Sequence, residues 1–397
     1  MKADLGFMGI MNNEKAVISK RATERIKAGH LWIYRSDITG FPAEGGSVVA
    51  VCDSGGKFYG KAFYSDKSQI ALRLLTTLDE TVDEGFWINR LESALILRRK
   101  VVVNSEVCRL VNGEGDGIPS VIVDRYKDVL SIQTLSQGSD KIKDLIAEIL
   151  SKLIDPVSII ERNDGKVRDL EGLPKQISVL KGYDPGEIVC LENGLKFYFH
   201  PSSGQKTGAF LDQRENRALA GRLSFGAGLD CFCYGGGFAL NMAGSCETVE
   251  AIDISESAIE LAKKNTLLNG IINIQFETDN VFDRLKLYDG QKRKFDTIIL
   301  DPPAFAKSRA HIKAAEKGYK EINLRAMRML NPGGLLITSS CSQHMDENAF
   351  LNILARAASD AGRKVQVIEK RTQGKDHPFL ISMPETFYLK CIFLRVL

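Results

Sequence analysis

The sequence has little of several features that would assign a protein class directly. None of its 8 cysteines forms a Cys-x-x-Cys pair, so the sequence predicts no zinc or other metal site. No apolar run is long enough to cross a membrane, and residues 1–13 lack the apolar core of a signal peptide. The formal net charge is only +3, so charge alone indicates no nucleic-acid partner. Several unpaired cysteines in a chain of this size favour a reducing, cytoplasmic location.

The length and composition are typical of a globular protein with more than one domain. The chain has 397 residues, of which 44% are hydrophobic and 26% charged. The pattern of strands and helices predicts a multi-domain α/β protein. Its predicted parts are a flexible extension (1–14), a small β-barrel (15–84), a central α+β domain with a connector helix (85–190) and a final α/β domain (191–397).

The stretch from Ala16 to about Leu75 contains short strands separated by glycines, which predicts a small β-barrel. These residues resemble the PUA domain, a small RNA-binding barrel. Five basic side chains could contact phosphates or could simply be solvated: Arg21, Arg25, Lys27, Arg35 and Lys61. Trp32 is interpreted as a core residue rather than a base-stacking one.

The central region predicts an α+β unit with strand order βββαβ. A helix from Glu84 to Lys100 leads into it, and Ser139 is expected to cap a second helix that runs through Leu153. No catalytic constellation is visible here, so a spacer or RNA-positioning role is expected.

The stretch from Leu229 to Phe238 organises the final domain. A buried strand is predicted to end at Asp230, and the glycines Gly235, Gly236 and Gly237 lead into a helix. A second predicted strand ends at Asp253, which completes a nucleotide-type βαβ unit. Three adjacent glycines are not the Gly-x-Gly-x-x-Gly of a dinucleotide site. An acid on the first strand instead suits the amine of S-adenosylmethionine.

Strands and helices then alternate, which predicts a mostly parallel seven-stranded sheet. The carboxyl ends of its strands should converge at one edge. That edge is expected to gather these side chains: Asp230, Asp253, Asp279 or Asn280, Asp301, and Ser339 to Ser342.

Asp301 opens the motif Asp301-Pro302-Pro303-Ala304-Phe305 at the end of the fourth strand. The two prolines fix an extended loop and remove two N–H donors, so their carbonyls are available as acceptors for a base. Phe305 could stack on that base. A plain loop is the alternative, but the position after an apolar strand favours the binding role.

Cys341 follows the fifth strand and is expected to face the same cleft. A thiolate that adds to carbon 6 of a pyrimidine activates carbon 5 as a nucleophile toward a methyl donor. Four other single cysteines are interpreted as inert core residues: Cys231, Cys233, Cys246 and Cys391.

Two further segments are candidates for binding. Residues 204–214 could form a lid over the cofactor, with Lys206 or Arg214 near its carboxylate, or could be a surface turn. A basic run after the catalytic loop could grip phosphates or could be a solvated helix face. It contains Lys307, Arg309, His311, Lys313 and Lys317.

Several motifs together resemble the RlmI-like family of ribosomal RNA large-subunit methyltransferases. The motifs are Asp230-x-Phe232-x-Tyr234-x-Gly236-Gly237-Phe238, Asp301-Pro302-Pro303-x-Phe305, Ser340-Cys341-Ser342, the segment 204–214, the stretch 115–119, His377-Pro378, and Pro384-Glu385-Thr386. The resemblance covers nearly the whole chain after the extension.

The resemblance implies a PUA domain, a central α+β domain and a class I (Rossmann-like) methyltransferase domain. It further implies methylation of cytosine at carbon 5 in 23S ribosomal RNA, with Cys341 as the nucleophile and Asp301 against the cytosine ring. The implied S-adenosylmethionine contacts are Asp230, Phe232, Tyr234, Gly235, Gly236, Gly237, Asp253, Asp301, Phe210, Gln213 and Arg214. The implied substrate contacts are Pro302, Pro303, Phe305 and Lys307. The family usually has an aspartate two positions before a phenylalanine at the adenine. Here Asn280 holds that spacing before Phe282, and Asp279 is the alternative.

Two other functions remain open at this point. One is methylation of an exocyclic amine of guanine or adenine, which needs no cysteine. The other is a non-catalytic RNA-binding assembly factor, although the intact acids and glycines argue against it. Whether the protein forms a homodimer is also left open.

Overall fold

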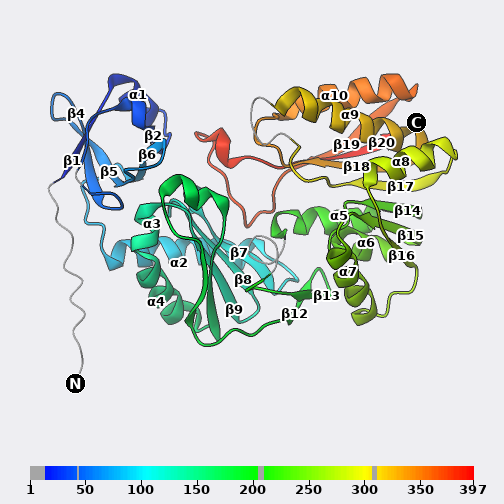
Figure 1. The fold of residues 1–397 in the computed structure, drawn as a ribbon, viewed down its shortest axis with the longest axis horizontal. Helices are drawn as coiled ribbons and strands as arrows, with labels where there is room; N and C mark the ends of the chain where they lie inside the picture. The colour runs from blue at the N-terminus through cyan, green and yellow to red at the C-terminus, as the bar shows by residue number, and fades with distance from the viewer. Residues whose placement is uncertain (1–13, 43, 204–209, 306–310) are drawn as a thin grey trace. The chain divides into compact units, whose positions relative to one another are not determined.

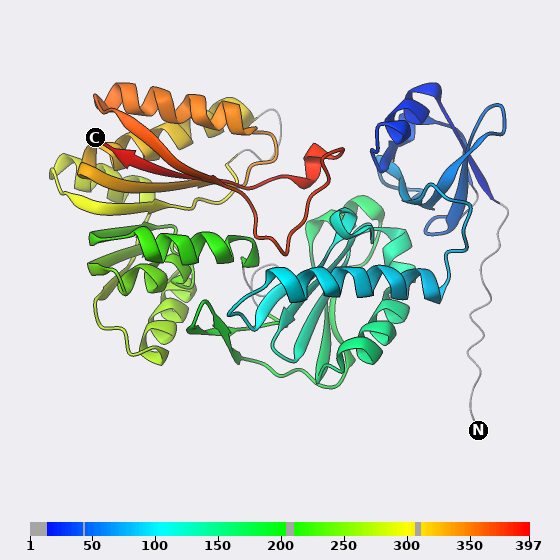
Figure 2. The ribbon, with the colours of Figure 1, turned by 180° about the vertical axis from the view of Figure 1, so that it is seen from behind.

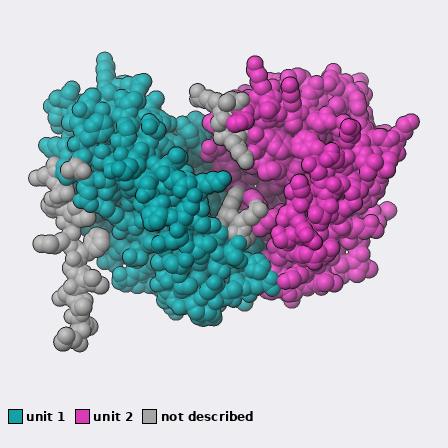
Figure 3. Space-filling view, in the orientation of Figure 1, with its two compact units in different colours: residues 1–188, 199–209, 375–386 teal, residues 189–198, 210–374, 387–397 magenta. Residues whose placement is uncertain are grey.

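The computed structural model describes residues 14–42, 44–203, 210–305 and 311–397. The chain divides into two compact units (Figure 3). The first comprises residues 1–188, 199–209 and 375–386, and the second comprises residues 189–198, 210–374 and 387–397. Lys206 and Lys307, both candidates for ligand contacts, lie outside the described residues.

The first unit begins with a six-stranded sheet in the order β2-β6-β5-β4-β1-β3 (Figure 1). Its strands are β1 (Lys15–Ile18), β2 (Trp32–Tyr34), β3 (Ile38–Gly40), β4 (Val48–Asp53), β5 (Phe58–Tyr64) and β6 (Ile70–Thr76). The Ser19 hydroxyl caps helix α1 (Lys20–Lys27). The prediction that Trp32 is a core residue is wrong. Its side chain is only half-buried and its Nε1 donates to Glu114 Oε1 at 2.9 Å, while Ile33 is the buried residue of β2.

Two basic residues of the barrel have structural partners. Arg21 and Arg25 both pair with the buried Asp37, at 2.7 Å and 3.0 Å. An unpaired buried carboxylate would be costly, so these arginines stabilise the fold whatever else they bind.

The central part of the first unit is a five-stranded sheet in the order β11-β10-β9-β8-β7. Its strands are β7 (Val107–Asn112), β8 (Val121–Tyr126), β9 (Val129–Thr134), β10 (Ser158–Asn163) and β11 (Gln176–Lys181). Figure 2 shows helix α2 (Glu84–Val101), in cyan, crossing in front of this sheet. Residues of α2, the sheet and helix α4 (Lys143–Ile154) share one hydrophobic core.

The predicted helix cap in the central part is wrong. Ser136, not Ser139, caps a short helix α3 (Gln137–Lys141), and α4 begins separately at Lys143. The Ser136 side chain accepts from the Ser139 backbone, and the Ser139 hydroxyl contacts the Ser136 backbone in return. Ser139 is therefore the third-position partner in a capping box, a role that a serine seldom fills.

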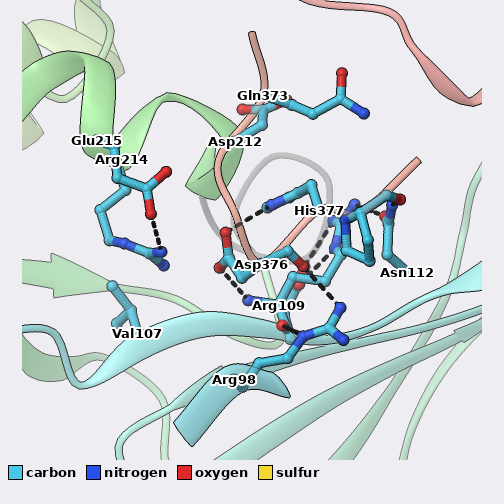
Figure 4. A network of polar contacts seen from close by, with 12 residues as sticks. Arg98, Val107, Arg109, Asn112, Asp212, Arg214, Glu215, Gln373, Asp376 and His377 are labelled. Carbon is cyan, nitrogen blue, oxygen red and sulfur yellow. Dashed lines mark hydrogen bonds and ion pairs between the residues drawn. The ribbon is translucent and has the colours of Figure 1, made fainter. Parts of the chain in front are cut away.

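Residues 375–386 belong to the first unit although their chain neighbours belong to the second. A buried polar network holds this segment (Figure 4). Arg98 donates to Asp116 Oδ2 at 2.7 Å and to the Asp376 carbonyl at 2.8 Å, and Asp376 Oδ2 accepts from the Arg109 backbone at 2.9 Å. His377 Nδ1 lies 3.0 Å from Asp376 Oδ1. Asp116 is thus more than a turn residue, since it anchors this segment through Arg98.

Gly115 also depends on this segment. A Cβ at Gly115 would lie 2.1 Å from the Pro378 carbonyl oxygen, so no side chain fits there. Two stretches that resemble the same family, 115–119 and His377-Pro378, therefore meet in space.

The second unit opens with the hairpin β12 (Ile188–Glu192) and β13 (Leu195–Phe199) and continues into a seven-stranded sheet. The strand order is β16-β15-β14-β17-β18-β20-β19, in which only the pairings of β20 with β18 and β19 are antiparallel. The strands are β14 (Gly226–Cys231), β15 (Cys246–Asp253), β16 (Ile274–Thr278), β17 (Phe295–Leu300), β18 (Leu330–Ser340), β19 (Val365–Arg371) and β20 (Lys390–Val396). The predicted mostly parallel sheet is confirmed.

Helices cover both faces of this sheet (Figure 1). Helices α8 (Val281–Gly290), α9 (Ile312–Met329) and α10 (Glu347–Ala361) share one core with the sheet. Helices α5 (Arg214–Leu223), α6 (Gly237–Ala243) and α7 (Glu256–Leu268) share the other. Alternate residues of β17 enter opposite cores, Ile298 the first and Ile299 the second, as expected for strands buried on both faces. Strand β18 begins at Leu330, directly after the last residue of α9.

Candidate active site

Four strands of the second unit end at one edge of the sheet, and each delivers a polar side chain there. Asp230 lies at the end of β14 and Asp253 at the end of β15. Asp301 directly follows β17, and Cys341 directly follows β18. Because these strands are parallel and adjacent, the sheet itself brings the four groups together.

The turn after β14 has an unusual backbone. Phe232 and Tyr234 adopt positive φ angles of 66° and 47°, and Gly236 follows with 81°. Such a conformation is costly for side chains with a Cβ, and it persists only where the surroundings enforce it. Asp253 is one cause, because its Oδ2 accepts from the Tyr234 backbone at 2.9 Å while its Oδ1 accepts from Ser255 N at 2.9 Å.

Asp230 lies buried beneath this turn. Its Oδ2 accepts from the Ala239 backbone at 2.8 Å, near the start of α6. Its Oδ1 is buried and has no hydrogen-bond partner among the described residues. Burial raises the pKa of Asp230 well above its usual value; the Ala239 hydrogen bond opposes this shift, and the charges of Asp301 and Asp253 add to it.

Three converging carboxylates and an orphaned buried acceptor suit a ligand with positive charge and an N–H donor. S-adenosylmethionine has both, as a sulfonium and an ammonium group. The residues present therefore fit this cofactor, with Asp230, Asp253 and the glycine turn placed to hold it.

Three residues predicted to contact the cofactor, Phe210, Gln213 and Arg214, lie around the start of α5, and Gln213 contacts Asp301. Gln213 Nε2 donates to Asp301 Oδ1 at 2.8 Å and to Ser339 Oγ at 3.2 Å. Gln213 Oε1 accepts from Asn216 at 2.6 Å, so its amide orientation is set by α5. Phe210 packs edge-on against Tyr234 with ring centroids 5.3 Å apart. Arg214 is buried and pairs with Glu215 at 2.8 Å.

Asp279 and Asn280 follow β16 at the same edge. Asp279 pairs with Arg284 at 2.7 Å, and Asn280 caps α8 by accepting from Phe282 N at 2.9 Å. The Asp279 carboxylate and the Asn280 side-chain oxygen thus already accept hydrogen bonds within the protein. The Asn280 side-chain N–H groups are placed to donate to a ligand.

The proline loop brings its carbonyl to the cysteine. Cys341 Sγ lies 3.9 Å from the Pro302 carbonyl oxygen, and Pro303 is exposed. Phe305 packs in an aromatic cluster, 4.7 Å from Tyr319 and 5.7 Å from Phe282 between centroids. Cys341 is half-buried, whereas the other seven cysteines are buried.

Three residues that the sequence analysis did not select also lie at this edge. Ile254 follows Asp253 and is 70% exposed, an apolar surface beside the predicted cofactor site. Tyr319 OH lies 3.0 Å from both the Ser340 and the Ser342 hydroxyls. Lys390 donates to the Ser342 carbonyl at 2.8 Å. Of these three residues, Ile254 was predictable from the sequence, because it is an apolar residue directly after an acid at the end of a predicted strand.

The chain is similar to known proteins over nearly all of its length. Residues 17–77 match a PUA-like domain family and residues 226–381 match a methyltransferase domain family. The ribosomal RNA large subunit methyltransferase I of Tolumonas auensis is 40% identical over 93% of this chain and 96% of its own. The chain belongs to the ribosomal RNA large subunit methyltransferase I family. Its relative of the same name in Aeromonas hydrophila is 40% identical over 92% of this chain and 95% of its own.

The fold of this methyltransferase also has a solved counterpart. A structure described as a SAM-dependent methyltransferase from Streptococcus mutans aligns with a TM-score of 0.82 and 21% identity, covering 96% of this chain and 100% of that one. The predicted PUA-like and Rossmann-like methyltransferase domains and the S-adenosylmethionine cofactor are thereby confirmed. Within the described part of the chain, no helix is long and apolar enough to span a membrane, and no cluster of metal-binding side chains occurs.

The raised pKa of Asp230 predicts how cofactor affinity depends on pH. A cationic ligand should lower the raised pKa of Asp230, so binding should release a proton and affinity should rise with pH up to the pKa of the free protein. Calorimetric titration in buffers of different protonation enthalpy measures the number of protons released on binding. It is done below about pH 7, where the ligand amine stays protonated. The Asp230→Asn variant should bind more weakly and without proton release. Binding by the unaltered protein without proton release would contradict the assignment.

Proposed function

We propose that the protein transfers a methyl group from S-adenosylmethionine to carbon 5 of a cytosine in 23S ribosomal RNA, in the cytoplasm. The single observation that carries this proposal is Cys341. It is the least buried cysteine of the chain, and it lies at the sheet edge beside the Asp301-Pro302-Pro303 loop. Its relatives' names supply the ribosomal substrate.

The chemistry requires a nucleophile at this position. The cofactor supplies an electrophilic methyl group. The Cys341 thiolate forms a bond to carbon 6, and the electron pair of the C5–C6 double bond makes carbon 5 nucleophilic. After methylation, loss of the carbon 5 proton to a base returns that pair to the ring and expels the thiolate. Asp301 directly follows β17 at the same edge, and in its protonated form it donates a hydrogen bond to the ring as negative charge develops there.

Substrate contacts are proposed around this centre. Pro302 and Pro303 offer carbonyls to the cytosine amino group, and the PUA-like barrel binds RNA outside the target nucleotide. Phe305 supports the loop by its packing against Tyr319, so stacking on the base is the lesser part of its role. The target base must be unpaired or flipped out to reach Cys341.

Hydrogen release from carbon 5 tests this proposal directly. Ribosomal RNA that carries tritium at carbon 5 of its cytosines should release one tritium to water for each methyl group transferred. Methylation of an exocyclic amine would leave the tritium in the RNA, and an assembly factor would transfer no methyl group. Methyl transfer without tritium release would therefore overturn the carbon 5 assignment and retain only the broader methyltransferase class.

A further inference from the structure

Lys390 is a buried lysine at the first position of β20. It pairs in register with Ser340 of β18, one residue before Cys341. Its side chain is only 2% exposed. Its Nζ donates to the carbonyls of Ser342 and Tyr388, each at 2.8 Å. The ammonium group therefore holds the loop on the far side of Cys341 while the strand pairing holds the near side.

Both hydrogen bonds of Lys390 go to neutral carbonyls. Among the described residues, no carboxylate oxygen lies within ion-pair distance of its Nζ. Burying a cation without an anion is costly, because hydration is lost and no charge replaces it. Burial accordingly lowers the pKa of Lys390 to about 8, and the charges that oppose this shift belong to Cys341 and Asp346.

The titratable groups around Lys390 leave Cys341 as its natural counter-ion. Asp346 comes from the start of α10, where its Oδ1 already accepts from Ala349 N at 2.7 Å. Tyr319 comes from α9, and burial raises its pKa, so it stays neutral. Its hydroxyl contacts Ser340 and Ser342 rather than the lysine. Cys341 is the remaining group, and a thiolate there would give Lys390 the anion it lacks.

We propose that Lys390 is a positioning residue that keeps Cys341 in its thiolate form and fixes the loop that presents it. The Lys390–Cys341 pair acts as one electrostatic unit, protonated on nitrogen and deprotonated on sulfur near neutral pH. Its use in catalysis rests on the proposed function, but the charge pair itself does not.

The pH profile of Cys341 alkylation tests the pair without any methyl transfer. Iodoacetamide reacts with thiolates, and the half-buried Cys341 should react first, which mass spectrometry of its peptide follows. In Lys390→Met the profile should shift upward by about one pKa unit, which makes alkylation about tenfold slower at pH values below both midpoints. Lys390→Arg should keep most of the wild-type rate, and Lys364→Met, at an exposed lysine, should leave it unchanged. An unshifted profile in Lys390→Met would overturn the proposal.

A reciprocal measurement covers the case in which Lys390→Met fails to fold. In Cys341→Ala, loss of the thiolate should lower the pH midpoint at which acetic anhydride modifies Lys390. An unchanged midpoint would equally overturn the proposal. Failure of the proposed function gives a different result from failure of the charge pair. If only the carbon 5 chemistry is wrong, tritium release is absent, but the shift of the Cys341 alkylation profile in Lys390→Met persists.

Discussion

We expect the Cys341→Ala variant to lose methyl transfer to ribosomal RNA almost completely, with kcat reduced at least about 10⁴-fold. Carbon 5 of cytosine is too weak a nucleophile to take the methyl group without prior attack at carbon 6. No other described cysteine can replace the thiol, since the remaining seven are all buried. Single-turnover transfer of a radiolabelled methyl group to RNA measures the loss.

The matched controls separate chemistry from folding. Cys52→Ala removes a buried thiol in the barrel and should leave kcat unchanged. Cofactor affinity of Cys341→Ala should stay within a few-fold of wild type, because Asp230 and Asp253 are untouched.

A mechanism-based trap gives a second readout for Cys341. RNA with 5-fluorocytosine should hold the protein as a thioether, because fluorine cannot leave as a proton does. The adduct should appear with Cys52→Ala and be absent with Cys341→Ala. Full methyl transfer by Cys341→Ala would contradict the covalent route and favour methylation of an exocyclic amine.

The parts of the fold that follow from local pattern were predictable from the sequence. The strand β17 (Phe295–Leu300) and the helix α7 (Glu256–Leu268), with its Ser255 cap, are two examples. An apolar run between polar ends specifies the first, and a serine before a helical pattern with Asn269-Gly270 after it specifies the second. The acids of the site were predictable for the same reason, because each stands at the end of such a strand.

The features that depend on distant partners were not predictable. Strand β11 was missed because exposed residues such as Ile177 and Val179 do not give the pattern of a buried strand, and only pairing with β10 defines it. Helix α8 was missed because Asp279 and Asn280 were considered only as ligand contacts, although Asn280 is its cap. The contact of Lys390 with the Cys341 loop was not predictable, because it depends on β20 pairing with β18. Lys390 is 48 positions from Ser342 in sequence, yet its Nζ donates a hydrogen bond to the Ser342 carbonyl.

Asp301→Asn should reduce kcat by about 10²- to 10⁴-fold, the range for losing a positioned acid–base group. When the thiolate attacks carbon 6, negative charge develops on the cytosine ring, and a carboxyl group at Asp301 can donate a proton to it. Asparagine keeps the size of the side chain and an oxygen to accept from Gln213, but it has neither the proton nor the charge. Single-turnover methyl transfer measures the loss, and cofactor titration serves as the control.

Gln213 offers a graded version of the same experiment. Its Nε2 holds Asp301 Oδ1 at 2.8 Å, so Gln213→Leu leaves the acid in place but without its orientation. We expect a loss of only about 10- to 100-fold, since misorientation costs less than removal of the group. The double variant should be no slower than Asp301→Asn alone, because the glutamine then has no acid to orient. If the two losses multiplied instead, Gln213 would have a separate role, such as the cofactor contact that the family resemblance implies.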